Sequence, residues 1–219
     1  MKNTFVICSS NRGMHERTRR SVQLLQLEGA LFSLQEGTAD VAFARNQALT
    51  WACAHVKTTP SFDVVLMVDD DVVFTVQTVR TLTEYVRKTG HPASAVYCSL
   101  GGRIAAATMD QPFPDGVQRW RTGLGLLAIP ANLLLDLEFR AKKFQHMENE
   151  LAEFCCTGVR GTEWIAEDWC LCERLGGVAL LPIEAGHLKT LMILPEQSTL
   201  DSIARGEALP LVQLPVVGT

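Results

Sequence analysis

The sequence lacks a long hydrophobic run. Near the N-terminus only Phe5 to Cys8 is continuously apolar, whereas a signal peptide needs an apolar stretch of about 7 to 15 residues and a membrane-spanning helix about 20. Neither segment is predicted, so we expect a soluble, cytoplasmic protein without a membrane span. For a viral protein, the expected compartment is the cytoplasm of the host.

An excess of positive charge is also missing, because 20 Lys and Arg residues stand against 24 Asp and Glu residues. This balance excludes a diffuse positive field that recruits nucleic acid or an anionic membrane. A local basic patch is still compatible with the sequence, and its candidate residues are Arg12, Arg17, Arg19 and Arg20.

A disulfide framework is not indicated either, since the seven cysteines are an odd number and suit a reducing compartment. Four of them lie near one another in the sequence: Cys155, Cys156, Cys170 and Cys172. Neither pair has the spacing of two to four residues that is usual between zinc-binding cysteines. We therefore expect buried free thiols.

The chain does contain apolar runs rich in β-branched residues, which alternate with segments of helical period. This alternation predicts an α/β fold with a mostly parallel sheet and flanking helices. The expected strands are Thr4–Cys8, Leu31–Leu34, Val64–Val68, Ala95–Ser99 and Val178–Leu181. The expected helices are 16–28, 41–55, 76–89, 130–139 and 165–175.

A length of 219 residues with 47% hydrophobic side chains is enough for one domain with a sizeable core. We expect a single domain over residues 1–194. Beyond Leu194 the chain becomes irregular and rich in proline, which indicates a C-terminal tail over residues 195–219. The polar stretch from Arg140 to Gly161 receives no predicted element.

Three consecutive carboxylates, Asp69, Asp70 and Asp71, directly follow the apolar run Val64–Val68. In an open α/β sheet, ligands bind at the carboxyl ends of the strands. Carboxylate oxygens suit Mg²⁺ or Mn²⁺, and such ions commonly bridge a few carboxylates to substrate phosphates. The alternative is a solvated acidic turn or a helix N-terminus, where aspartates are also favoured.

Three further segments carry candidate functional residues. Arg45 and Asn46 lie on an expected helix, where an arginine can recognise phosphate or a base edge, although a lone arginine is more often a surface residue. The glycines of Gly123-Leu124-Gly125 can let a sugar approach the backbone closely. The pair Glu167 and Asp168 can divide the positioning and the deprotonation of an acceptor hydroxyl, or can simply begin an exposed helix.

The order of these features resembles that of the GT-A glycosyltransferases, especially the inverting, DxD-containing family 2. Members show a polar turn after the first strand, an Ala-Arg-Asn phrase, an Asp-x-Asp motif, a glycine-rich strand, a Glu-Asp motif and a late histidine. The corresponding segments here are Cys8 to Arg12, Ala44-Arg45-Asn46, Asp69-Asp70-Asp71, Gly123-Leu124-Gly125, Glu167-Asp168-Trp169 and His187. The resemblance extends from Thr4 to Lys189. It implies a GT-A-type, Rossmann-like α/β fold.

The resemblance also implies roles for individual residues. Asp71 would bind the metal ion, with Asp69 near the ribose or the metal and His187 completing the metal site. Asp168 would be the catalytic base, and Glu167 would help to hold the acceptor. The residues implied on the donor side are Ser9, Ser10, Asn11, Arg12, Arg45, Asn46, Asp69, Asp70, Gly123 and Gly125.

The function implied is the transfer of a sugar from a nucleotide-sugar, most simply a UDP- or GDP-sugar, to an acceptor hydroxyl with inversion and with Mn²⁺ or Mg²⁺. The acceptor is left open by the sequence. It can be a saccharide, a protein or a modified DNA base, as in phage-type DNA-base glycosyltransferases. The alternatives are a nucleotidyltransferase of related fold and a non-catalytic nucleotide-sugar-binding protein. No sequence feature indicates the oligomeric state.

Overall fold

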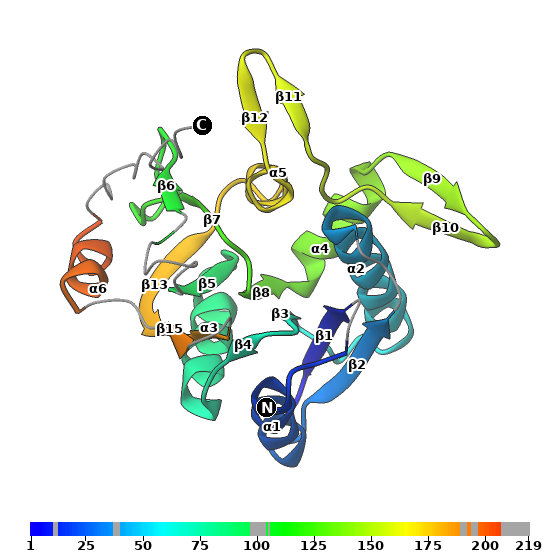
Figure 1. The fold of residues 1–219 in the computed structure, drawn as a ribbon, viewed down its shortest axis with the longest axis horizontal. Coiled ribbons are helices and arrows are strands. Elements are labelled where there is room, and N and C mark those ends of the chain that lie inside the picture. Colours follow the sequence, from blue (N-terminus) through cyan, green and yellow to red (C-terminus); the bar gives the residue numbers. More distant parts are fainter. Residues whose placement is uncertain are drawn as a thin grey trace, which may run out of the picture.

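A six-stranded sheet forms the centre of the protein (Figure 1). The computed structural model describes residues 1–10, 13–36, 40–96, 104, 106–188, 192–193 and 197–206. In spatial order the strands are β13 (Ala179–Glu184), β5 (Ala93–Val96), β8 (Leu126–Pro130), β3 (Val64–Asp69), β1 (Thr4–Ser10) and β2 (Leu31–Glu36). Only β8 runs antiparallel to its neighbours, so the predicted mostly parallel sheet is confirmed.

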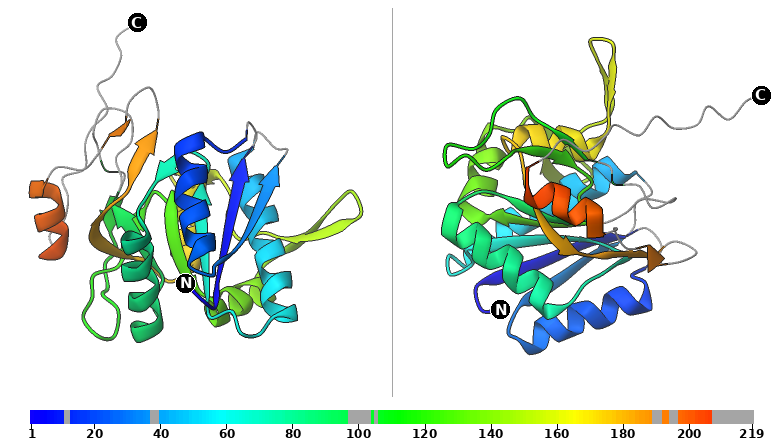
Figure 2. Two further views of the ribbon diagram at one scale, coloured as in Figure 1. Left: turned by 90° about the horizontal axis from the view of Figure 1, so that it is seen from below. Right: turned by 90° about the vertical axis from the view of Figure 1, so that its left-hand side faces the viewer.

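Helices cover both faces of this sheet (Figure 2). On one face lie α2 (Val41–Thr58), α4 (Ala131–Arg140) and α5 (Glu167–Arg174), and on the other lie α1 (Glu16–Leu27) and α3 (Val76–Thr89). Strand β1 shows the division, because Phe5 and Ile7 pack towards α2 while Val6 and Cys8 pack towards α1. Burial on both faces explains why the central strands are continuous apolar runs.

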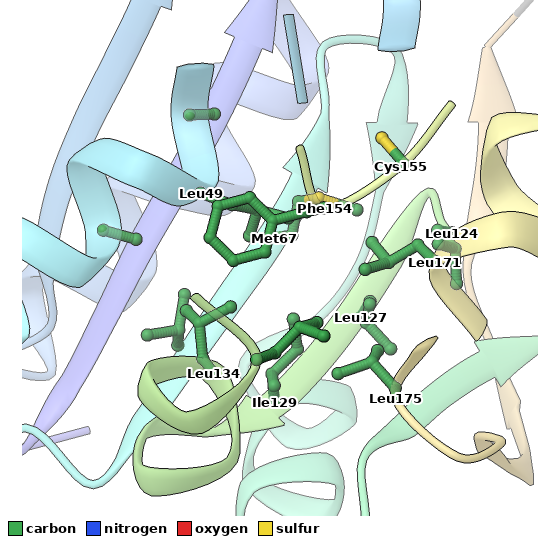
Figure 3. Packing of buried hydrophobic residues seen from close by; sticks show 14 of the residues in the cluster. Leu49, Met67, Leu124, Leu127, Ile129, Leu134, Phe154, Cys155, Leu171 and Leu175 are labelled. Carbon is green, nitrogen blue, oxygen red and sulfur yellow. The ribbon is translucent and has the colours of Figure 1, made fainter. Parts of the chain in front are cut away.

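The larger hydrophobic cluster fixes α2 and α5 against the sheet (Figure 3). Leu49 of α2, Leu171 of α5 and Leu127 of β8 are all completely buried in it. Helix α2 carries Arg45 near its start, and α5 carries Glu167 and Asp168 in its first turn. All three are among the residues predicted to carry chemistry. Their backbones are therefore held by packing rather than left on exposed loops.

Local capping sets the ends of the helices. The side chain of Thr75 accepts the backbone N–H of Thr78 at the start of α3, and Gly90 ends that helix in the left-handed conformation with φ of 71°. A threonine before a helix and a glycine directly after it are residue types that favour such caps. Helix α2 begins in the same way, because the Asp40 carboxylate accepts the N–H of Phe43 and thereby places Arg45 in the second turn.

The polar stretch without a predicted element forms hairpins that project from the body (Figure 1). The first pairs β9 (Lys143–His146) with β10 (Asn149–Ala152), and the second pairs β11 (Gly158–Arg160) with β12 (Glu163–Ile165). Both hairpins have mostly exposed or half-buried side chains, so they lack the apolar alternation from which strands are predicted.

The expectation of an irregular chain beyond Leu194 is wrong for part of that segment. Helix α6 (Gln197–Ala204) forms there, and its Leu200 and Ile203 are buried against Trp120 and Leu180. Its eight residues are fewer than the window of about 11 to 18 residues over which a helical period can be recognised in the sequence. The other expected elements are confirmed with small shifts of their ends, and residues 97–99 of the expected fourth strand lie outside the described residues.

The remaining strands are short: β4 (Val72–Val73), β6 (Ala106–Thr108), β7 (Trp120–Thr122), β14 (Gly186–Leu188) and β15 (Met192–Ile193). Of these, β14 pairs with both β4 and β15. In the part of the chain that the structure describes, no helix has the length and apolar character needed to cross a bilayer.

Candidate functional site

The acidic triplet lies at the carboxyl edge of the sheet, as predicted. Asp69 is the last residue of β3, and its backbone N–H donates to the carbonyl of Gly125 at 2.9 Å. The Ser10 hydroxyl, at the end of β1, donates to Asp70 Oδ2 at 2.5 Å. The N–H of His15 donates to the carbonyl of Asp70 at 2.9 Å. The turn after β3 is thus held by neighbouring segments on both sides.

Arg45 joins the acidic triplet to the Glu-Asp motif. Its side chain is 4% exposed, and its guanidinium lies 3.2 Å from Asp69 and 3.1 Å from Glu167 and also contacts Asp168. Three carboxylates therefore share one buried guanidinium. This cluster, formed by Arg45, Asp69, Glu167 and Asp168, is called the carboxylate cluster below.

Asp168 has an unusual electrostatic environment within the carboxylate cluster. Burial raises the pKa of its carboxyl from 3.8 to about 6, and the charges of Asp69 and Glu167 add to the increase, while Arg45 opposes it. A carboxyl with this pKa is ionised at neutral pH yet basic enough to accept a proton. These are the properties expected of a general base.

The raised pKa of Asp168 predicts a pH dependence of stability. Between pH 4 and pH 6 the folded protein holds this proton more tightly than the unfolded chain, so the free energy of unfolding contributed by Asp168 falls as the pH rises. Asp168→Asn cannot titrate. The stability of the wild type relative to this variant should therefore decrease by about 2 kcal/mol between pH 4 and pH 7. Urea unfolding at several pH values measures this, and a pH-independent difference would contradict it.

The late histidine lies beside the third aspartate. His187 Nε2 is 3.3 Å from Asp71 Oδ1, and both side chains are largely buried. Pairing of β14 with β4 brings them together, since His187 lies opposite Val72 and the N–H of Leu188 donates to the carbonyl of Asp71 at 2.7 Å. Two residues separated by more than a hundred positions thus form one pair.

The pair of Asp71 and His187 is compatible with a divalent ion. Among the described residues, no group of three or more His, Cys, Asp or Glu side chains is arranged as a metal site. An ion held here would have an oxygen and an imidazole nitrogen from the protein. Mn²⁺ and Mg²⁺ commonly accept so few protein ligands when substrate phosphates and water complete the coordination.

The other residues predicted on the donor side lie in different surroundings. Asn46 is buried, where its Oδ1 accepts the N–H groups of Phe154 and Cys155 and its Nδ2 donates to the Cys155 carbonyl. Ser9 is half-buried and lies opposite Asp69 in the sheet. Gly123 and Gly125 are buried between β7 and β8. Asn11 and Arg12 lie outside the described residues.

Comparison with known proteins gives a likeness in fold. Neither a protein-family model nor a curated protein matches the sequence. Among solved structures, A197 from STIV has 14% sequence identity and a TM-score of 0.54, over 90% of this chain and 95% of that chain. The protein thus shares a fold with this structure over nearly its whole length. Its fold is the α/β arrangement, with a mostly parallel sheet and flanking helices, that was predicted.

Two enzymes are among the more distant structural neighbours. A glycosyltransferase involved in the glycosylation of the major capsid of PBCV-1 has 12% identity and a TM-score of 0.33, over 60% of this chain and 61% of that chain. The 4-diphosphocytidyl-2C-methyl-D-erythritol synthase from Anaerococcus prevotii has 12% identity and a TM-score of 0.42, over 94% and 98%. Likeness at this level carries no conclusion about activity.

Proposed function

We propose that the protein is a metal-dependent glycosyltransferase that moves a sugar from a UDP- or GDP-sugar to an acceptor hydroxyl with inversion. The observation that carries this proposal is the carboxylate cluster, which lies at the carboxyl edge of the sheet and contains a carboxyl with a raised pKa. Asp71 follows directly in the turn after β3, and together with His187 of β14 it would supply two ligands for an ion.

Proton transfer is the step assigned to the protein's own residues. As the acceptor oxygen forms its bond to the anomeric carbon, its proton passes to Asp168, and the bond between that carbon and the phosphate oxygen breaks. Glu167, the preceding residue on α5, would hold the acceptor hydroxyl. An ion held by Asp71 and His187 would neutralise the charge of the departing diphosphate. Together these contributions combine acid-base and electrostatic assistance.

A ligand screen tests the proposal without knowledge of the acceptor. A ligand that binds only the folded protein raises its thermal stability by mass action. We expect one nucleotide-sugar among UDP-, GDP-, CMP- and dTDP-sugars to raise the Tm, and to do so more with Mn²⁺ than without. Stabilisation by a nucleoside triphosphate and a sugar phosphate, but by no nucleotide-sugar, would instead identify a nucleotidyltransferase.

Asp71→Asn is expected to abolish the metal-dependent part of donor binding. At a donor concentration of about 100 times Kd, binding stabilises the wild type by about 2.7 kcal/mol, and the variant should show little of this in Mn²⁺. The chain offers a matched control, because Asp115 contacts His91 at 3.2 Å just as Asp71 contacts His187. Asp115→Asn should bind donor normally. If Asp71→Asn also binds donor and Mn²⁺ like the wild type, the metal assignment is wrong.

A further inference from the structure

Two cysteine sulfurs lie in contact next to the carboxylate cluster. The Sγ atoms of Cys156 and Cys170 are 3.4 Å apart, and the backbone N–H of Cys156 also donates to the Cys170 sulfur at 3.4 Å. Cys170 is buried on α5, two residues after Asp168, whereas Cys156 is half-buried and thus within reach of a solute. The function proposed above makes no use of this pair.

Each of these sulfurs has a guanidinium beside it. Arg174 Nη2 is 3.8 Å from Cys156 Sγ, and Arg160 Nη2 is 3.9 Å from Cys170 Sγ. A positive charge beside a thiol favours the thiolate, which is the nucleophile in thiol chemistry. Burial and the adjacent thiol nevertheless raise the pKa of Cys156, and Arg174 opposes this increase. The reactive thiolate of Cys156 is therefore populated mainly at alkaline pH.

The neighbouring cysteines have different partners. The thiol of Cys155 contacts the Asn46 side chain at 3.4 Å and the Ala42 carbonyl at 3.5 Å, both on α2. The thiol of Cys172 donates to the carbonyl of Thr122 at 3.5 Å. Two cysteines that are adjacent or nearly adjacent to the pair in sequence thus point elsewhere. They provide controls, because each lies in the same tryptic peptide as one member of the pair.

We propose that Cys156 and Cys170 are a modification site at which a low-molecular-weight disulfide, such as oxidised glutathione, forms a reversible intramolecular disulfide. The thiolate of Cys156 attacks one sulfur of oxidised glutathione and releases the first glutathione thiolate. The thiolate of Cys170 then attacks the Cys156 sulfur of the mixed disulfide and releases the second. The two protein thiols lose two protons and two electrons in total, and oxidised glutathione is reduced to two molecules of glutathione.

The position of this bond links two parts of the candidate site. It would connect α5, which carries Glu167 and Asp168, to the segment that Asn46 holds against α2. The intervening chain includes the β11–β12 hairpin. The bond would thus tie together two segments that border the carboxylate cluster without consuming any residue of that cluster.

Peptide mapping of the full-length protein tests the proposal independently of any enzymatic activity. The protein is incubated with oxidised glutathione, alkylated without reduction, and digested with trypsin. We expect a disulfide that joins the tryptic peptides 144–160 and 161–174, whose fragmentation places the bond between Cys156 and Cys170. Reduction with dithiothreitol should release both peptides, and the bond should form faster at pH 8.5 than at pH 7.

Single substitutions assign the bond to its two sulfurs. Cys156→Ser and Cys170→Ser should each abolish the linked peptide, whereas Cys155→Ser and Cys172→Ser should keep it. A bond through Cys155 or Cys172, or a stable glutathione adduct on Cys156 without the second step, would overturn the proposal. The linked peptide is already detected in the wild type without any substitution, so the test does not depend on whether each variant folds.

Discussion

Arg45→Met is expected to lower the free energy of unfolding by about 3 to 5 kcal/mol at neutral pH, the usual cost of removing one partner from a buried ion pair. The Arg45 side chain is 4% exposed and contacts Asp69, Glu167 and Asp168. Methionine fills a similar volume without charge, so its effect reports on electrostatics more than on packing. Without the guanidinium, three neighbouring carboxylates repel one another in a poorly solvated place.

The pH dependence of this loss separates the electrostatic explanation from a packing defect. In Arg45→Met the carboxylates should take up protons more readily than in the wild type, so the deficit should shrink as the pH is lowered from 7 to 5. Arg80→Met is the matched control, because Arg80 pairs with Glu28 on the surface and both side chains are well exposed. It should cost no more than about 1 kcal/mol. Equal losses for the two variants, measured by urea unfolding, would show that Arg45 has no special role.

Much of the fold was predictable because its signals are local. The caps of α3, formed by Thr75 and Gly90, depend on residues within the helix or next to it. The run Val64–Val68 predicts a strand buried on both faces from its own composition. The acidic triplet directly follows this run, so its place at the carboxyl edge of the sheet was also predictable. Ligands bind at that edge in open α/β sheets.

The contacts within the site were not predictable because they depend on packing between distant segments. Arg45 and Glu167 are 122 residues apart in the sequence, and only the packing of α2 and α5 on one face of the sheet brings them together. The sequence indicated a functional arginine on the nucleotide side of the site. It did not reveal that the guanidinium of Arg45 contacts three carboxylates. Asn46 likewise holds the segment at Phe154 and Cys155, which no sequence pattern revealed.

The carboxylate cluster gives Asp168 an unusual acidity. Burial raises the pKa of Asp168 to about 6, although Arg45 contacts both Asp168 and Glu167. A base needs a pKa close to the working pH, and the raised pKa of Asp168 meets this need. The role proposed for Asp168 thus follows from its environment, which differs from that of an exposed carboxylate.

Asp168→Asn is expected to lower turnover by about two to four orders of magnitude, the range that general acid-base assistance usually contributes. Asparagine keeps the shape and can still accept a hydrogen bond from Arg45, but it cannot take a proton from the acceptor. Donor binding should survive, because the diphosphate side of the site is assigned to Asp71 and His187, which lie in a separate pair. The expected signature is therefore a loss of kcat with little change in the affinity for the donor.

Release of the nucleotide measures this turnover even before the acceptor is known, since water or an added sugar can accept the transferred group. Wild-type turnover should rise as the pH passes through about 6, where Asp168 ionises, and the variant should lose this rise. Glu173→Gln provides the control on the same helix, because Glu173 pairs with Arg121 and Arg160 outside the carboxylate cluster. It should retain both the rate and the pH profile. Turnover that persists in Asp168→Asn would remove this residue from the mechanism, whereas joint loss of turnover and donor affinity would mean that Asp168 shapes the donor site.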